Sequence, residues 1–157
     1  MFAPPNVVFI KNFDFERPDA PPRNKFMIVL LQEDADSIIV TLTTSKDKVP
    51  SFHKGKRCVV DHDNGVHFYY MPKGHQVGKN GFAFPDDTWV QFYQNIKRTS
   101  VTKLSDTYLQ ANNAMLVCEL HDSEYSDLLY CIYKSKFVPR GIRRSLEPII
   151  ERIEQAH

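Results

Sequence analysis

The alternation of apolar and polar residues predicts a series of short β-strands in the first part of the chain. It is clearest over residues 37–44, where Ile38, Val40 and Leu42 recur with the two-residue period of a strand. Runs of β-branched and aromatic residues predict further extended segments at residues 7–15, 26–31, 58–60, 66–71 and 88–93. This part of the chain is therefore expected to be mainly β.

Proline, acidic residues and glycine mark the connections between these strands. Residues 16–23 contain three prolines, which lack backbone donors and therefore predict a loop. The acidic residues 33–36 predict a turn that joins the strands on either side into a hairpin. Five of the six glycines fall between Gly55 and Gly81, as expected for tight connections between short, curved strands. We therefore expect a small, strongly curved β barrel.

Helical periodicity appears in the last third of the chain. Ser105 is a suitable N-cap for a helix with the apolar positions Tyr108, Ala111, Met115 and Leu116. A second helix is predicted behind Asp122 or Ser123, from the spacing of Tyr125, Leu128, Leu129, Ile132 and Tyr133. Residues 130–133 also fit an extension of a strand.

The clearest helical stripe covers residues 145–155, and its apolar face consists of Leu146, Ile149, Ile150 and Ile153. Pro148 falls in the first turn of this predicted helix, where its missing N–H is tolerated. The length of 157 residues fits a single domain. We therefore expect one domain over residues 1–157, mainly β with α additions, in which residues 105–157 form a mixed helical extension packed on the barrel.

The net charge of +1 is unevenly distributed along the chain. The first basic segment contains Lys46, Lys48, Lys54, Lys56 and Arg57, with Asp47 as its one acid. The second contains Lys134, Lys136, Arg140, Arg143 and Arg144 and has no acid. Such segments attract nucleic-acid phosphates, although many basic clusters are only solvated surface.

Three cysteines, Cys58, Cys118 and Cys131, form an odd set without CxxC spacing. Reduced thiols are therefore expected, with neither a disulfide framework nor a zinc knuckle. No apolar run approaches the roughly 18 residues of a membrane span, and the first residues lack a basic leader. We expect no membrane partner and a cytoplasmic location.

Three motifs in residues 6–45 resemble the MazF/PemK (Kid) toxin family. NVVFIKNFDF resembles the family's opening strand, with Asn6 at the position of a glycine and Val7 at that of an aspartate. RNKFMIVLL resembles a Lys-x-Arg-Pro motif with the apolar strand that follows it, so Arg23 takes the Lys position and Lys25 the Arg position. VTLTTS resembles the family's Thr-rich strand end, and a looser match covers residues 81–104, where Gln94 takes an acidic position.

This resemblance implies an SH3-like barrel, often dimeric, and a toxin that cleaves single-stranded RNA without a metal or other cofactor. A cognate antitoxin holds such toxins inactive. In the reaction, the ribose 2′-oxygen attacks the adjacent phosphate. It needs a base for that oxygen, cationic stabilisation of the phosphate and an acid for the leaving 5′-oxygen.

The resemblance also implies the site residues. Lys25 or Arg23 would supply the cation and the acid, and Thr43 would hydrogen-bond a phosphate oxygen. The basic residues Lys46, Lys48, Lys54, Lys56 and Arg57 would follow the RNA backbone. An ammonium lacks the bidentate contacts of a guanidinium, so Lys25 departs from the family pattern.

Gln94 cannot act as a base, so a histidine is the alternative proton carrier. The candidates are His53, His62, His67 and His75, although scattered histidines are usually structural or merely exposed. The acids and histidines of residues 61–75 match no familiar metal-binding spacing, which favours a polar turn. Cys58, beside Arg57, is a candidate nucleophile or, more simply, a buried and inert thiol.

Two other functions remain open on the sequence alone. One is an SH3-like barrel that binds a nucleic acid or a protein without cleaving it. The other is an unrelated small β-rich domain whose match to the family is accidental.

Overall fold

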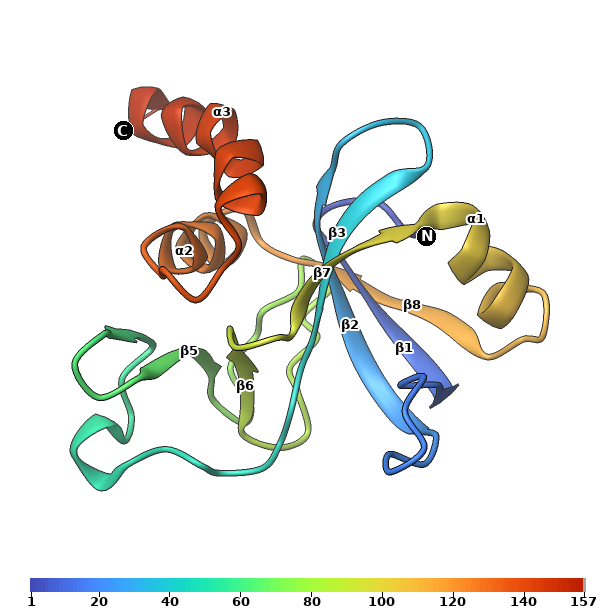
Figure 1. Ribbon diagram of the computed structural model, residues 1–157, viewed down its shortest axis with the longest axis horizontal. Coiled ribbons are helices and arrows are strands. Elements are labelled where there is room, and N and C mark those ends of the chain that lie inside the picture. The colour runs from blue at the N-terminus through green and yellow to red at the C-terminus, as the bar shows by residue number, and fades with distance from the viewer. Residues whose placement is uncertain (157) are drawn as a thin grey trace.

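A computed structural model describes residues 1–156 and contains two antiparallel β-sheets and three α-helices (Figure 1). The prediction of a mainly β protein with α additions is confirmed. Within the described residues the two sheets are separate ladders, joined by one isolated bridge between Thr44 and Trp89. They are not closed into a barrel, so the predicted SH3-like barrel is not confirmed.

The larger sheet has five strands in the order β7-β3-β2-β1-β8. Their bounds are β1 Asn6–Phe13, β2 Arg23–Gln32, β3 Ser37–Leu42, β7 Ile96–Ser100 and β8 Ala114–Glu119. The predicted hairpin is confirmed, because β2 and β3 pair in antiparallel fashion around the acidic turn. The proline-rich segment between β1 and β2 is a loop, as predicted.

The smaller sheet has three strands in the order β4-β5-β6. They are β4 Cys58–Asp61, β5 Val66–Met71 and β6 Thr88–Gln91, and each agrees with a predicted extended segment. Alternation along β5 turns Phe68 toward a small cluster with Val59 and Trp89. It turns Tyr69 and Met71 to the opposite face, toward the main core.

The first predicted helix is only partly correct. The chain is helical over α1 Val101–Leu104 and a π-helical turn, η2 Ser105–Leu109, and the N-cap is Ser100 rather than Ser105. Met115 and Leu116 lie instead in β8, where they pair with Phe9 and Val8 of β1. Their helical spacing was misleading because these residues pair with β1 in the sheet. Local periodicity does not reveal a pairing between distant parts of the chain.

The other two helices follow the prediction more closely. Helix α2, Asp122–Tyr133, confirms the helical alternative for residues 130–133. Helix α3, Arg140–Ala156, begins before residue 145, so that Pro148 lies inside the helix and not in its first turn. Ile142, Leu146 and Ile150 form its buried stripe. In Figure 1, α2 lies beside the smaller sheet, α3 lies above α2, and both are on the opposite side of the molecule from α1.

Two hydrophobic clusters cover the two faces of the five-stranded sheet. Ile28 and Leu30 of β2 face the larger cluster, which includes the buried apolar residues of α2 and α3 and one face of the smaller sheet. Met27 and Val29 face the smaller cluster, which is closed by Leu104 and Tyr108 from the α1 and η2 segments. The larger cluster therefore fixes α2 against the smaller sheet.

The predicted reduced state of the cysteines is wrong for two of the three. Cys58 of β4 and Cys131 of α2 form a disulfide across 73 residues of sequence. The sequence could not show this pairing, because only the packing of α2 on the smaller sheet brings the two residues together. Cys118 is free and buried, so the expectation of a reduced thiol holds for this residue, and burial raises its pKa to about 11.

Candidate functional site

The structure brings two of the three predicted catalytic residues into direct contact. The Lys25 ammonium donates to the backbone oxygen of Thr43 at 3.0 Å, from β2 to the residue that follows β3. Burial, followed by the charges of Arg23 and Lys46, lowers the pKa of Lys25. Arg23 itself is exposed, and its guanidinium carbon lies 5.0 Å from the centre of the Phe15 ring. Lys25, Arg23 and Lys46 thus form a cationic group at one end of the five-stranded sheet.

The hydroxyl of Thr43 is not accessible at this cationic group. Thr43 is 4% exposed, and its Oγ1 lies 3.5 Å from the backbone oxygen of Phe26. Only the carbonyl of Thr43 meets Lys25. In this conformation the residue orients the ammonium through its main chain, and its side chain is shielded from a phosphate.

The predicted nucleic-acid-binding segment is divided by the fold. Lys46 and Lys48 are exposed, whereas Lys54 lies 3.5 Å from Asp47 and Lys56 hydrogen-bonds the imidazole of His53. Arg57 points inward to the carboxylate of Glu124. The segment therefore presents lysines on its surface and contributes its arginine to a different cluster.

This second cluster surrounds the buried carboxylate of Glu124, whose side chain is 5% exposed. Arg57 Nη2 donates to both carboxylate oxygens, at 2.9 and 2.7 Å. The imidazole Nε2 of His75 lies 2.6 Å from Oε1, and the Tyr69 hydroxyl donates to Oε2. We call these four residues the Glu124 cluster. Both oxygens of its carboxylate are therefore hydrogen-bonded, as a buried charge requires.

Four separate elements supply the Glu124 cluster. Arg57 directly precedes β4, Tyr69 lies on the α2-facing side of β5, and His75 lies in the connection between β5 and β6. Glu124 lies in the first turn of α2, where the helix dipole favours a negative charge. The Cys58–Cys131 disulfide fastens the same helix to the sheet, and just after the helix ends Ser135 hydrogen-bonds His67 of β5.

The cluster combines an enclosed interior with a solvent-facing rim. Burial and the neighbouring Glu124 carboxylate raise the pKa of Tyr69, so its phenol stays protonated and acts as a donor. The side chains of His75 and Arg57 are 41% and 38% exposed. A solute can therefore reach an imidazole and a guanidinium that a shared carboxylate holds in place.

This arrangement supports proton transfer beside a bound anion. A neutral His75 that donates through Nε2 to Glu124 presents Nδ1 as a proton acceptor, because the carboxylate fixes its tautomer. Arg57 supplies a permanent positive charge next to it. Within residues 1–156, no group of three or more His, Cys, Asp or Glu residues has the arrangement of a metal site.

The remaining histidines among the predicted proton carriers are engaged elsewhere. His53 is buried and lies 2.8 Å from the carboxylate of Asp61. His67 is buried and its Nδ1 lies 2.6 Å from Ser135 Oγ. His62 accepts a hydrogen bond from the backbone N–H of Lys136. His75 is thus the candidate that combines an exposed ring with a carboxylate partner.

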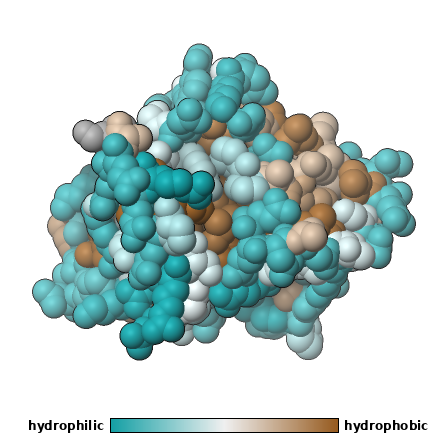
Figure 2. All heavy atoms as spheres, turned by 90° about the horizontal axis from the view of Figure 1, so that it is seen from above, coloured by the Kyte–Doolittle hydropathy of each residue, from teal (hydrophilic) through white to brown (hydrophobic). Residues whose placement is uncertain are grey.

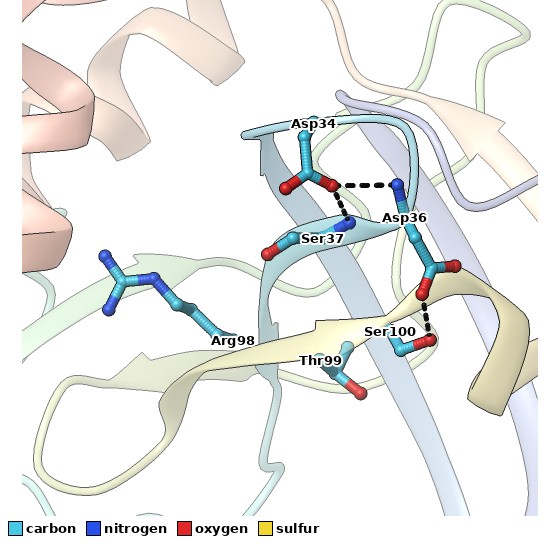
Figure 3. Close-up of a pocket in the computed structure, with 6 residues that line it drawn as sticks. All are labelled: Asp34, Asp36, Ser37, Arg98, Thr99 and Ser100. Atoms are coloured by element: carbon cyan, nitrogen blue, oxygen red, sulfur yellow. Dashed lines mark hydrogen bonds between the residues drawn. The ribbon is translucent and has the colours of Figure 1, made fainter.

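A shallow hollow at the other end of the five-stranded sheet is stabilised by its own polar groups (Figure 3). Asp34 accepts from the backbone N–H groups of Asp36 and Ser37, and Asp36 accepts from the Ser100 hydroxyl. Figure 3 shows these groups turned toward one another, while Arg98 points away from the two aspartates. The hollow therefore lies between the β2–β3 hairpin turn and β7, and its polar groups stabilise that turn.

Comparison with known proteins leaves the MazF/PemK resemblance a prediction, because the chain matches no family model, curated protein or solved structure at a significant level. In addition, no helix within residues 1–156 is both long and apolar enough to cross a membrane.

Sequence reasoning identified His75 as a candidate proton carrier and Arg57 as a candidate nucleic-acid-binding residue. It missed Glu124 and did not assign Tyr69 to this site. Glu124 falls in an acidic stretch next to Asp122 and Asp127, where no local signal separates a buried carboxylate from exposed ones. Tyr69 is one of several adjacent aromatic residues. The period of β5 places it on the same face as His67, but only α2 decides that this face meets Glu124.

Proposed function

We propose that the protein is a metal-independent endoribonuclease that cleaves single-stranded RNA, with the Glu124 cluster as its reacting centre. The observation that carries the proposal is the contact of 2.6 Å between the half-exposed imidazole of His75 and the buried carboxylate of Glu124, beside the Arg57 guanidinium. The reaction class is the one that the MazF/PemK resemblance implies. The centre differs from the Arg23, Lys25 and Thr43 set that the resemblance suggests.

In the proposed reaction, His75 Nδ1 takes the proton of the ribose 2′-hydroxyl. The 2′-oxygen attacks phosphorus, and the bond from phosphorus to the 5′-oxygen breaks, which leaves a 2′,3′-cyclic phosphate. Solvent water protonates the departing 5′-oxygen. Arg57 stabilises the negative charge that builds on the phosphate oxygens, and Glu124 stabilises the imidazolium.

The cationic group of Arg23, Lys25 and Lys46 has a binding role in this proposal. Its charges hold phosphates of the same RNA strand, together with the exposed Lys48. Binding by these residues depends on salt and needs no interaction with the Thr43 hydroxyl.

The deciding experiment incubates purified protein with end-labelled single-stranded RNA in EDTA. We expect cleavage with 2′,3′-cyclic phosphate ends, and a loss of roughly 100-fold or more in rate for His75→Ala, in line with the usual contribution of a general base. Lys73→Ala, in the same connection, is the matched control and retains the wild-type rate.

A second pair of variants separates the two possible centres. If Lys25→Ala abolishes cleavage while His75→Ala leaves it intact, the reacting centre lies on β2 and the assignment to the Glu124 cluster is wrong. If the folded wild-type protein binds RNA and leaves it uncut, the protein is the non-catalytic binding module of the alternative hypothesis.

The finer points of the resemblance belong to the same proposal. The bridge between Thr44 and Trp89 supports a relation to SH3-like barrels, because it links the segment after β3 to β6 of the other sheet. The toxin hypothesis also includes an antitoxin partner, a homodimer and a cytoplasmic location. Growth arrest when the protein is expressed is the direct test of toxicity.

A further inference from the structure

An exposed aromatic pair lies on the side of the smaller sheet where α2 ends. Tyr93, after β6, is 63% exposed, and Phe137, between α2 and α3, is 38% exposed. Their ring centroids are 5.8 Å apart, in an edge-to-face arrangement. Because the two exposed rings contact each other, they form a small continuous apolar patch on the surface.

The ring of Phe137 rests on a rigid support. It stacks on His67 with 3.9 Å between centroids and an angle of 22° between the planes. The backbone N–H of Phe137 donates to Ser135 Oγ, which in turn bonds His67 Nδ1. Burial lowers the pKa of His67, so this supporting ring stays neutral. Part of the Phe137 ring is thus held toward solvent at a low cost in side-chain entropy.

The charge around the aromatic pair is positive. Phe137 lies in the second basic segment, which has no acid between Lys134 and Glu147. Lys136 and Arg140 flank it in sequence and are exposed. Lys134 is directed elsewhere, because its ammonium makes a cation–π contact with Tyr130 at 4.9 Å from the ring centre. Two acids lie near this site: Asp61 at the end of β4, whose charge acts on His67, and the exposed Asp63 on the turn before β5.

We propose that Tyr93 and Phe137 form a base-stacking site for single-stranded RNA, with Lys136 and Arg140 binding the flanking phosphates. Stacking on an aromatic ring beside cations is how proteins hold single strands without reading their sequence. The positive charge of Lys136 and Arg140 disfavours a basic partner at this site. Duplex RNA is also a poor ligand, because its bases are stacked on one another and expose no free face. In Figure 2, which shows the molecule from above, the surface over α3 is mostly hydrophilic.

This inference extends the proposed function, on which it rests, by naming how the substrate is held. Helix α2 connects the two sites, since Glu124 lies in its first turn and Phe137 follows its last. The helix has 12 residues, which corresponds to about 18 Å at 1.5 Å per residue. A strand that stacks on Phe137 can therefore reach the Glu124 cluster with a few nucleotides.

The test measures binding separately from cleavage. A fluorescent 2′-O-methyl oligonucleotide has no free 2′-hydroxyl and stays intact, so its anisotropy reports affinity alone. We expect Tyr93→Ala and Phe137→Leu each to weaken binding about tenfold, because base stacking contributes roughly 1–3 kcal/mol per base. Phe137→Leu keeps an apolar side chain on His67, and Tyr93→Ala removes a mostly exposed ring, so both variants retain the fold.

Matched controls remove exposed side chains elsewhere. Met115→Ala, at 56% exposure, and Lys11→Ala are expected to bind as the wild type does. Lys136→Ala and Arg140→Ala weaken binding and reduce the slope of log K against log salt, by about 0.7 for each phosphate that the variant no longer neutralises.

The outcomes for the two proposals are distinguishable. If Tyr93→Ala and Phe137→Leu bind the oligonucleotide as tightly as the wild type, or if duplex RNA binds equally well, the stacking site is wrong whatever the cleavage assay shows. If both variants bind the oligonucleotide more weakly but the wild-type protein does not cleave natural RNA, the stacking site stands and the proposed catalysis fails. In the expected case, both variants lose activity on long RNA and retain it on a dinucleotide.

Discussion

Arg57 and Glu124 are 67 residues apart in the chain, yet Nη2 of the guanidinium lies within 2.9 Å of both oxygens of the carboxylate. The contact joins the start of β4 to the first turn of α2. Because Glu124 is buried and Arg57 is partly exposed, the pair has one end in the interior and one in solvent. It therefore affects both the attachment of the helix and the chemistry of the rim.

Glu124→Gln tests the first of these roles. The amide keeps the shape of the side chain but loses the charge that Arg57 and His75 face, so we expect the free energy of unfolding to fall by about 1–3 kcal/mol. Urea denaturation followed by circular dichroism measures the change. Glu119→Gln removes the exposed partner of Lys79 and should have a smaller effect. Equal effects of the two substitutions would contradict a structural role for the Glu124 cluster.

Reduction of the Cys58–Cys131 disulfide is expected to destabilise the protein without unfolding it. The bond closes a loop of 73 residues, and disulfides typically contribute about 2–4 kcal/mol. Melting temperatures with and without reductant, and for Cys58→Ser, measure the loss. Cys118→Ala leaves the bond intact and should keep the same response to reductant as the wild type. A native thiol titration that detects a reactive Cys58 in oxidised protein would rule out the bond.

The pH dependence of stability in acid is expected to involve Asp61. Hydrogen bonds from His53, and next from Asn64, lower the pKa of Asp61 from 3.8 to about 2. A carboxyl with a depressed pKa stabilises the folded state above pH 3.8, and that contribution is lost as the pH falls toward about 2. The melting temperature of Asp61→Asn should therefore change less with pH between these two values than the melting temperature of the wild type. The exposed neighbour Asp63, replaced by Asn, serves as the control, and an unchanged Asp61→Asn profile would refute the assignment.

Two glycine substitutions should act in opposite directions. A Cβ at Gly78 would lie 2.7 Å from Cys118 Cβ and 2.9 Å from its Sγ, so Gly78→Ala should lower stability by about 1–3 kcal/mol. A Cβ at Gly141, in the first turn of α3, would meet only the Arg98 side chain, at 3.5 Å. Gly141→Ala should therefore keep or slightly raise stability, since alanine favours a helix. Denaturant midpoints for both variants decide the matter.

The sequence by itself determined most strands, the hairpin at the acidic turn and two of the three helices. These features depend on local periodicity, on proline and on turn residues, which act over a few positions. It also marked His75 as a possible proton carrier and Arg57 as a possible nucleic-acid-binding residue. The helical pattern at Met115 and Leu116 was overridden by pairing with β1.

Only the tertiary structure decided the open two-sheet arrangement, the disulfide and the Glu124 cluster. The last two depend on the packing of α2 against the smaller sheet, which is set by apolar residues from many parts of the chain. Contacts across 55 to 73 residues, such as Tyr69 with Glu124 and Cys58 with Cys131, have no short-range signature. The physical reason is that burial is a property of the whole core, whereas the sequence pattern reports only the periodicity of single elements.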